Sequence, residues 1–144
     1  LHGIGISSSE IIRYSHADAT TSASAKVLII DNIGMLSALY AYGRIAYIGG
    51  GFGKSIHNVL EPAVFGMPVV FGPRFEKFNE AKQLIELGSA FGINNETELK
   101  NILDKISNDD QLLKSLSDKS YGFVQNNRGA TKIILDKFSS LLSH

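Results

Sequence analysis

Short apolar runs alternate with amphipathic stretches along most of the chain. The apolar runs predict strands at residues 10–14, 26–30, 45–48, 68–71 and 90–93. Apolar residues at helical spacing predict helices at 35–42, 57–65 and 78–87, from 97, around 112–116, and from just after Gly129. Gly88 is expected to end the helix at 78–87, and the Ser/Ala/Thr-rich stretch at 15–25 predicts a polar loop.

The alternation of strands and helices predicts the α/β class, with a Rossmann-like parallel sheet covered by helices on both faces. In such sheets, ligands bind beyond the carboxyl ends of the strands, where the order of the strands reverses. Three segments begin at predicted strand ends, namely residues 31–36, 49–61 and 72–80. We therefore expect the binding site to be built from these segments.

The composition of the chain excludes several classes of protein. The 144 residues suit a single domain over 1–144, and 44% hydrophobic with 19% charged residues is typical of a folded protein. Fourteen basic and fourteen acidic side chains balance, which argues against a nucleic-acid binder. Because cysteine is absent, a disulfide scaffold, a cysteine zinc site and a thiol nucleophile are excluded. The longest aliphatic run, 27–30, is far shorter than the roughly 20 residues of a membrane-spanning helix.

The strongest chemical signal is the segment Ile48-Gly-Gly-Gly-Phe-Gly-Lys-Ser-Ile-His-Asn-Val-Leu-Glu-Pro62. Glycines after a strand let the backbone approach a ligand closely, and a helix beginning near His57 would attract phosphate or carboxylate to its N-terminus. A P-loop is excluded because Ile48 occupies the position of its first glycine. The dinucleotide fingerprint fails because Lys54 or Ile56 occupies the position of its last glycine. The alternative is a tight turn that binds nothing.

Asn58 and Glu61 are three residues apart at the start of the same predicted helix, so we expect them to share a face. An amide beside a carboxylate can hold a vicinal diol such as that of a ribose. The alternative for Glu61 is an acid that stabilises the helix N-terminus. His57 and Glu61 have the spacing of two metal ligands, but the chain has no cysteine and no second histidine nearby. We therefore predict no metal and no cofactor.

Cationic side chains are expected at the same rim of the sheet. Arg74 and Lys77 follow one predicted strand and Lys54 follows another, so an anionic ligand would meet several positive charges. The alternative is a charged loop that only faces solvent. Asp31 either joins this rim or forms the N-cap of the helix that begins near Gly34, and both interpretations stay open.

Four segments together resemble the carboxyl-terminal half of 3-deoxy-D-manno-octulosonic acid (Kdo) transferases. They are Val-Leu-Ile-Ile-Asp-Asn-Ile-Gly at 27–34, Leu-Tyr-Ala-Tyr at 39–42, Gly-Gly-Gly-Phe-Gly-Lys-Ser-Ile-His-Asn-Val-Leu-Glu-Pro-Ala at 49–63 and Phe-Gly-Pro-Arg-Phe-Glu-Lys-Phe at 71–78. The resemblance runs from about residue 27 to residue 142. The glycine loop (residues 49–57) and residues 71–81 are similar to the form found in Bacteroidetes-type bacteria.

The resemblance implies a GT-B glycosyltransferase with two Rossmann-like domains, of which this chain is the donor-binding one. It implies transfer of Kdo from CMP-Kdo to a lipid A precursor in lipopolysaccharide assembly. Asn58 and Glu61 would then lie at the ribose or the adjoining phosphate. The complete set of donor-binding residues that we predict is Ile33, Gly34, Met35, Gly49, Gly50, Gly51, Gly53, Lys54, His57, Asn58, Glu61, Arg74 and Lys77.

The chain departs from the family pattern at two places. Many members have Gly-Glu-Leu where this chain has Gly-Met-Leu at 34–36, so any role of that glutamate is absent. The usual Gly-Gly-His-Asn is Ser-Ile-His-Asn at 55–58, which changes the turn before the histidine. Two other functions stay open, namely a GT-B transferase that uses a UDP-sugar and a nucleotide-binding module without chemistry.

The remaining parts of such an enzyme are expected before Leu1, in an amino-terminal domain. One of these parts is the catalytic base, which is expected to be a carboxylate. The other is the hydrophobic segment that holds the enzyme at the cytoplasmic face of the inner membrane. We therefore assign no catalytic residue, and we expect this fragment alone to be soluble and inactive, with acceptor and membrane contacts made through the other domain.

The first strand of the sheet is also expected before Leu1, which would leave the strands at 10–14 and 26–30 without their bridge to the strand at 45–48. We expect either a proteolytic remnant or the exchange of a segment with a neighbouring copy. A continuous sheet with residues 1–6 as a central strand would refute this expectation.

Overall fold

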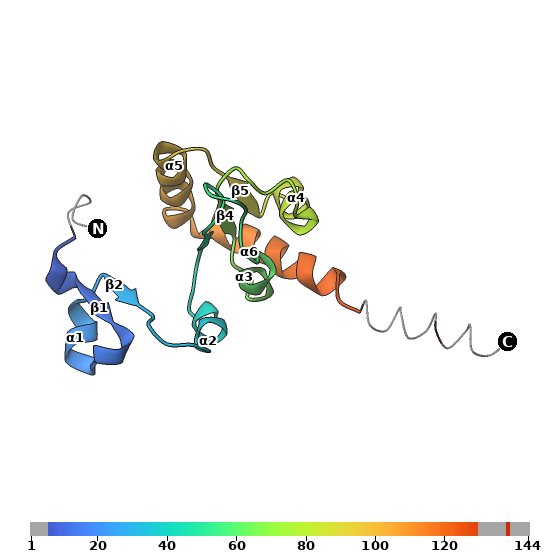
Figure 1. The fold of residues 1–144 in the computed structure, drawn as a ribbon. Coiled ribbons are helices and arrows are strands. Elements are labelled where there is room, and N and C mark those ends of the chain that lie inside the picture. The colour runs from blue at the N-terminus through green and yellow to red at the C-terminus, as the bar shows by residue number, and fades with distance from the viewer. Residues whose placement is uncertain (1–5, 130–137, 139–144) are drawn as a thin grey trace. The chain divides into compact units, whose positions relative to one another are not determined.

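The computed structural model describes residues 6–129 and residue 138. The chain divides into two compact units, unit 1 (residues 1–39) and unit 2 (residues 40–144) (Figure 1). The helix expected after Gly129 therefore falls almost entirely outside the described residues. The single domain expected over the whole chain stays a prediction.

Unit 1 is built on two parallel strands, β1 (Ile11–Arg13) and β2 (Val27–Ile29). Helix α1 (Ala19–Ser24) lies between them in the chain, and two single-turn 3₁₀ helices, η2 (Ser8–Glu10) and η3 (Tyr14–His16), flank β1. None of the residues 6–18 and 20–39 of unit 1 is fully buried. A two-stranded sheet has marginal stability by itself, so polar contacts contribute a larger share of the stability of unit 1 than of unit 2.

Helix α1 corrects the prediction of a polar loop at residues 15–25. The carboxylate of Asp18 accepts hydrogen bonds from the N–H groups of Thr20 (2.9 Å) and Thr21 (2.8 Å). In return, the Asp18 N–H donates to the hydroxyl of Thr21 at 3.0 Å. This reciprocal cap satisfies the first N–H groups of the helix and starts it without an apolar stripe. The hydrophobic pattern of this segment therefore does not predict the helix.

Unit 2 contains a three-stranded parallel sheet in the order β3 (Ala46–Ile48), β4 (Val69–Phe71) and β5 (Ala90–Gly92). All pairs in both sheets are parallel, which confirms the predicted strand direction. The three residues of the central strand β4 have no exposed surface. Such complete burial is typical of parallel strands covered on both faces, and it explains why β4 reads as an uninterrupted apolar run.

Helices follow the strands as predicted. They are α2 (Leu36–Tyr40), α3 (Leu60–Val64), α4 (Asn79–Glu86), α5 (Glu96–Ser107) and α6 (Asp110–Asn126). Helix α6 packs on α3 and α5, and α4 packs on β5. The start of α3 corrects the prediction, because the helix begins three residues after His57 and has only five residues.

Local chemistry sets the ends of the longer helices. The side-chain oxygens of Asn95 and Asp109 begin α5 and α6 by accepting the N–H groups of Glu98 (2.9 Å) and Leu112 (2.8 Å). Gly88 has a φ of +75° just after α4 and ends that helix as predicted.

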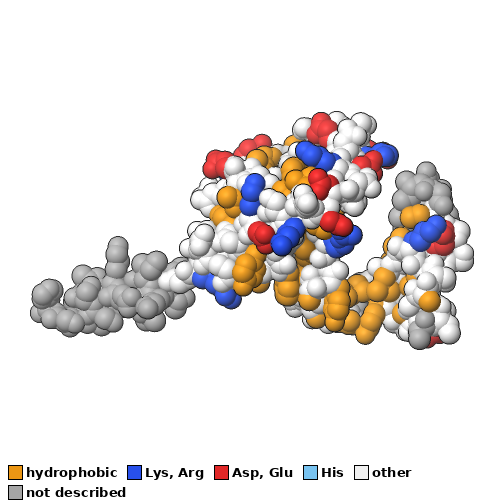
Figure 2. Space-filling view, turned by 180° about the vertical axis from the view of Figure 1, so that it is seen from behind, with side chains coloured by type: hydrophobic (Ala, Val, Ile, Leu, Met, Phe, Trp, Pro, Cys, Tyr) orange, Lys and Arg blue, Asp and Glu red, His pale blue; other side chains and the backbone are white. Residues whose placement is uncertain are grey.

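The core of unit 2 lies between the sheet and its helices. Its largest fully buried side chains include Phe71 of β4 and Leu84 of α4, and the rings of Phe71 and Phe75 pack at a centroid distance of 5.2 Å. Hydrophobic side chains also reach the surface (Figure 2). One of them, Phe52, lies in the glycine loop with 52% of its surface exposed.

The described strands form two sheets, and no described strand pairs with both. Residues 1–5, which the prediction about the first strand concerns, lie outside the described part of the chain, so that prediction stays open. None of the helices in residues 6–129 combines the length and apolar content needed to cross a membrane.

Replacing Leu84 by Ala should lower the free energy of unfolding of unit 2 by about 2–5 kcal/mol, because it leaves a cavity in a fully buried part of the core. The control is Leu87→Ala just after the same helix, where the side chain is 40% exposed and the loss should stay below about 1 kcal/mol. Urea unfolding followed by amide NMR signals of unit 2 measures both values. Equal losses would contradict this description of the core.

Candidate functional site

Two loops leave the carboxyl ends of neighbouring parallel strands in unit 2. Residues 49–59 follow β3, and residues 72–78 follow β4. Because Ile48 and Phe71 are partners in the sheet, both loops begin at the same edge. This is the edge at which the sequence predicts a ligand, and ten of the thirteen predicted donor-binding residues belong to these two loops and the first turn of α3.

The two loops touch through their backbones, which requires glycine. A Cβ atom on Gly51 would lie 2.6 Å from the nitrogen of Gly72, and one on Gly72 would lie 2.7 Å from the carbonyl carbon of Gly51. Gly50 has a φ of +90°, and a Cβ there would lie 2.2 Å from the carbonyl oxygen of Ser55. These contacts explain the run of glycines better than a simple need for flexibility.

Four carbonyl oxygens of the glycine loop (residues 49–57) accept hydrogen bonds from the protein. The pairs are the Gly49 carbonyl with the His57 N–H (3.2 Å), the Gly50 carbonyl with the Gly53 N–H (2.8 Å), the Gly51 carbonyl with the Arg74 N–H (3.1 Å), and the Gly53 carbonyl with Nη1 of Arg74 (2.5 Å). The loop therefore turns its acceptors toward the protein.

The N–H groups of the same peptide units have no such partners. Those of Gly50, Gly51, Phe52 and Lys54 meet no acceptor among residues 6–129. In a trans peptide the N–H and the preceding C=O point in opposite directions, so a held carbonyl fixes the direction of the N–H beside it. Consecutive unpaired N–H groups form a concavity that attracts anions. The glycine loop is therefore a candidate anion site.

Asn58 and Glu61 lie together, as predicted. Nδ2 of Asn58 donates to Oε1 of Glu61 at 3.0 Å, and Oδ1 of Asn58 accepts the N–H of Leu60 at 2.9 Å. Both side chains are exposed, and the amide holds the carboxylate in one orientation. Because α3 begins at Leu60 and is so short, an anion would meet the loop N–H groups rather than the predicted helix N-terminus near His57.

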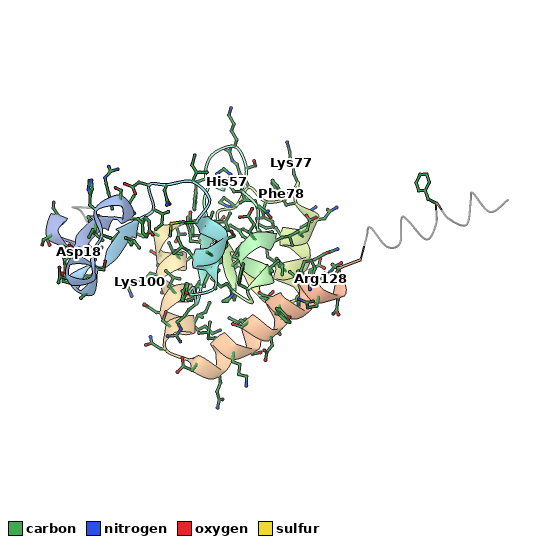
Figure 3. The ribbon with its side chains drawn as sticks, turned by 90° about the horizontal axis from the view of Figure 1, so that it is seen from below. Asp18, His57, Lys77, Phe78, Lys100 and Arg128 are labelled. Atoms are coloured by element: carbon green, nitrogen blue, oxygen red, sulfur yellow. The ribbon has the colours of Figure 1, made fainter. Side chains whose placement is uncertain are left out.

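Lys54, Lys77 and Arg74 are all exposed at this edge. Figure 3 shows His57, Lys77 and Phe78 projecting from the same side of unit 2. Arg74 differs from the two lysines, because its guanidinium donates to the Gly53 carbonyl. Its contact with a ligand stays a prediction, and its contact with the loop was not predicted.

A cavity of about 280 Å³ lies beside the glycine loop. It is lined by Ile56, His57, Asn58, Val59, Leu60, Phe78 and Glu80. Ligand pockets usually measure roughly 300–1,000 Å³, so this one suits a single ring rather than a whole nucleotide sugar. Phe78 and Glu80 are absent from the predicted set, although their place where α4 begins beyond β4 was a usable signal.

Comparisons with known proteins identify the family of the chain. Over 117 residues, or 79% of the chain, it is 32% identical to the 3-deoxy-D-manno-octulosonic acid transferase of Rickettsia prowazekii (strain Madrid E), covering 25% of that protein. It is 44% identical over 75 residues to the one from Aquifex aeolicus (strain VF5), covering 51% of the chain and 21% of that protein. The chain belongs to the Kdo transferase family.

The chain spans about a quarter of the length of the Kdo transferases that it matches. No family model matches it. The crystal structure of the C-terminal CMP-Kdo binding domain of WaaA from Acinetobacter baumannii is similar, with a TM-score of 0.71 at 24% identity, covering 80% of this chain and 61% of that one. This likeness confirms the predicted Rossmann-like α/β fold. The likeness to Bacteroidetes-type members stays a prediction.

The other three predicted donor-binding residues belong to unit 1 and are Ile33, Gly34 and Met35. They lie between β2 and α2, where Gly34 has a φ of +97° and Ile33 is fully exposed. Sδ of Met35 accepts a hydrogen bond from Nδ2 of Asn32 at 2.9 Å. Their contact with a nucleotide stays a prediction.

Asp31 does not form the N-cap of the next helix, which corrects one of its two interpretations. Its carboxylate instead accepts the N–H (3.0 Å) and the hydroxyl (2.7 Å) of Ser15, and Arg13 lies 3.8 Å away. Helix α2 begins only at Leu36. The bonds from Ser15, aided by the charge of Arg13, lower the pKa of Asp31 below its usual value. Asp31 thus joins the ends of β1 and β2.

Replacing Gly51 by Ala should push the two loops apart, because the added methyl group overlaps the backbone of Gly72. We expect a loss of stability of about 1–3 kcal/mol and altered amide shifts throughout the glycine loop. The control is Gly122→Ala in α6, where a Cβ meets nothing within 4 Å and stability should not fall. Unchanged stability and unchanged loop shifts in the Gly51 variant would contradict the close contact.

The Ser15–Asp31 link should loosen on acidification. Because folding lowers the pKa of Asp31, the link contributes fully above the unfolded value of about 3.9 and is lost as the pH falls through the folded value. NMR titration of the Asp31 carboxyl carbon should show a midpoint below that of an ordinary aspartate. Ser15→Ala should raise the midpoint, and an ordinary midpoint in the unsubstituted chain would refute the link.

Proposed function

We propose that this chain binds CMP-Kdo and forms the donor half of an enzyme that transfers Kdo to a lipid A precursor in lipopolysaccharide assembly. One observation carries the proposal. The glycine loop directs four carbonyl oxygens to protein donors and leaves the N–H groups of the same peptide units without protein acceptors in the described residues. CMP-Kdo carries a phosphate and a carboxylate, the two groups that such a loop binds.

The Asn58–Glu61 pair supplies a second contact of suitable chemistry. A carboxylate can accept hydrogen bonds from the two adjacent hydroxyls of a ribose. The bond from Asn58 holds Glu61 in place before the ligand arrives. In this proposal the loop binds the phosphate and the carboxylate of the donor, and Glu61 binds its ribose.

The proposed role in catalysis is electrostatic. During transfer the bond between the anomeric carbon of Kdo and the phosphate oxygen of CMP breaks, and its electron pair stays on the phosphate. The acceptor hydroxyl forms the new bond and loses its proton to a base that we place in an amino-terminal domain, together with the acceptor site and the contact with the inner membrane. N–H groups that already point at the leaving phosphate stabilise its growing charge without rearrangement.

Replacing Glu61 by Gln should weaken CMP binding roughly tenfold or more, because it removes a charged acceptor from the ribose hydroxyls. Gln preserves the size of the side chain and its bond with Asn58. The matched control is Glu86→Gln in the last turn of another helix, α4, where CMP affinity should not change. Titration of the ¹⁵N-labelled chain, followed by amide shifts, measures both dissociation constants.

The same titration with UDP tests the choice of nucleotide. Selective binding of CMP supports the proposal, whereas equal or tighter binding of UDP would favour a transferase that uses a UDP-sugar. If neither nucleotide binds, the titration is repeated on a longer protein that contains this chain. Absence of CMP binding there would reject the proposal.

A further inference from the structure

We propose that Arg74 is a positioning residue, which holds the glycine loop in the conformation that presents its N–H groups to an anion. Arg74 makes two bonds to this loop. Its backbone N–H donates to the Gly51 carbonyl at 3.1 Å, and Nη1 of its side chain donates to the Gly53 carbonyl at 2.5 Å. One residue of the loop after β4 therefore holds two of the four carbonyls directed toward the protein.

These two bonds also fix the orientation of two N–H groups, because each carbonyl belongs to a rigid peptide unit. The Gly51 carbonyl shares a rigid plane with the N–H of Phe52, and the Gly53 carbonyl shares one with the N–H of Lys54. Glycine rotates about its backbone bonds more freely than other residues. Without Arg74 these two units can turn over, which replaces an N–H donor by a carbonyl oxygen that repels an anion.

The side-chain bond is the part that a substitution can test. The backbone N–H of residue 74 is present whatever its side chain, and the Gly51–Gly72 contact supports that end of the loop. The Gly53 carbonyl, in contrast, accepts from the guanidinium of a residue 21 positions away. We therefore expect the loss of the Arg74 side chain to affect Gly53 and Lys54 more than Gly51.

This inference deepens the proposed function, since it takes the anion to be the phosphate or carboxylate of the donor. A side chain that only contacts the ligand would change affinity but leave the ligand-free loop unaltered. A positioning residue must also change the loop when no ligand is present. The ligand-free loop is therefore the decisive readout.

The experiment compares Arg74→Met, which keeps the length but removes the donors, with Arg74→Lys, which keeps a long cationic donor. ¹⁵N relaxation of the ligand-free chain should show Gly53 and Lys54 becoming mobile on the nanosecond timescale in Arg74→Met, with order parameters below about 0.6. Arg74→Lys should restore most of the order. The control Lys77→Met removes the same charge from the same loop, and it should leave the ligand-free order of Gly53 unchanged.

Binding is measured with CMP and with inorganic phosphate as probes. Arg74→Met should weaken whichever probe binds by roughly tenfold, and Arg74→Lys should recover most of that loss. An ordered ligand-free loop in Arg74→Met would overturn the positioning role, even if affinity falls. If the unsubstituted chain binds phosphate but not CMP, the proposed donor fails, whereas the positioning role still stands or falls on the loop measurement.

Discussion

The backbone contact between Gly51 and Gly72 is the constraint on which the site depends. Parallel pairing of β3 with β4 delivers two loops to one edge of the sheet, but only a pair of residues without side chains lets the loops meet. That contact brings the N–H and the guanidinium of Arg74 within reach of two loop carbonyls. The direction of the unpaired N–H groups follows from which carbonyls are held.

The buried centre of unit 2 makes this arrangement rigid. Strand β4 is completely covered, and it leads directly into Gly72 and the residues that hold the glycine loop. Unit 1 lacks such a core, because none of its residues 6–18 and 20–39 is fully buried. Its strands are joined by polar contacts, namely the Ser15–Asp31 bonds and the ion pair between Lys26 and Glu10. Such exposed contacts depend on pH and salt far more than a packed core does.

The proposed anion site differs from the one expected for a Rossmann-like fold. There, a helix N-terminus after a glycine turn usually faces the phosphate. Here α3 is a single short turn that begins beyond His57, and its first N–H is already capped by Asn58. In the proposed function the loop itself provides the donors, and Glu61, held by Asn58, is the group proposed to contact the hydroxyls of the ligand.

Apolar runs and glycine breaks in the sequence were sufficient to predict the strands of both sheets and their parallel direction, whereas the glycine loop as an anion site stays a prediction. These features depend on residues that are close together in the chain. The tertiary structure alone decided that Asp31 bonds to Ser15, 16 positions away, and that Arg74 bonds to Gly53, 21 positions away. A local pattern shows that a charged residue lies in a loop. Its partner depends on how the strands bring distant loops together.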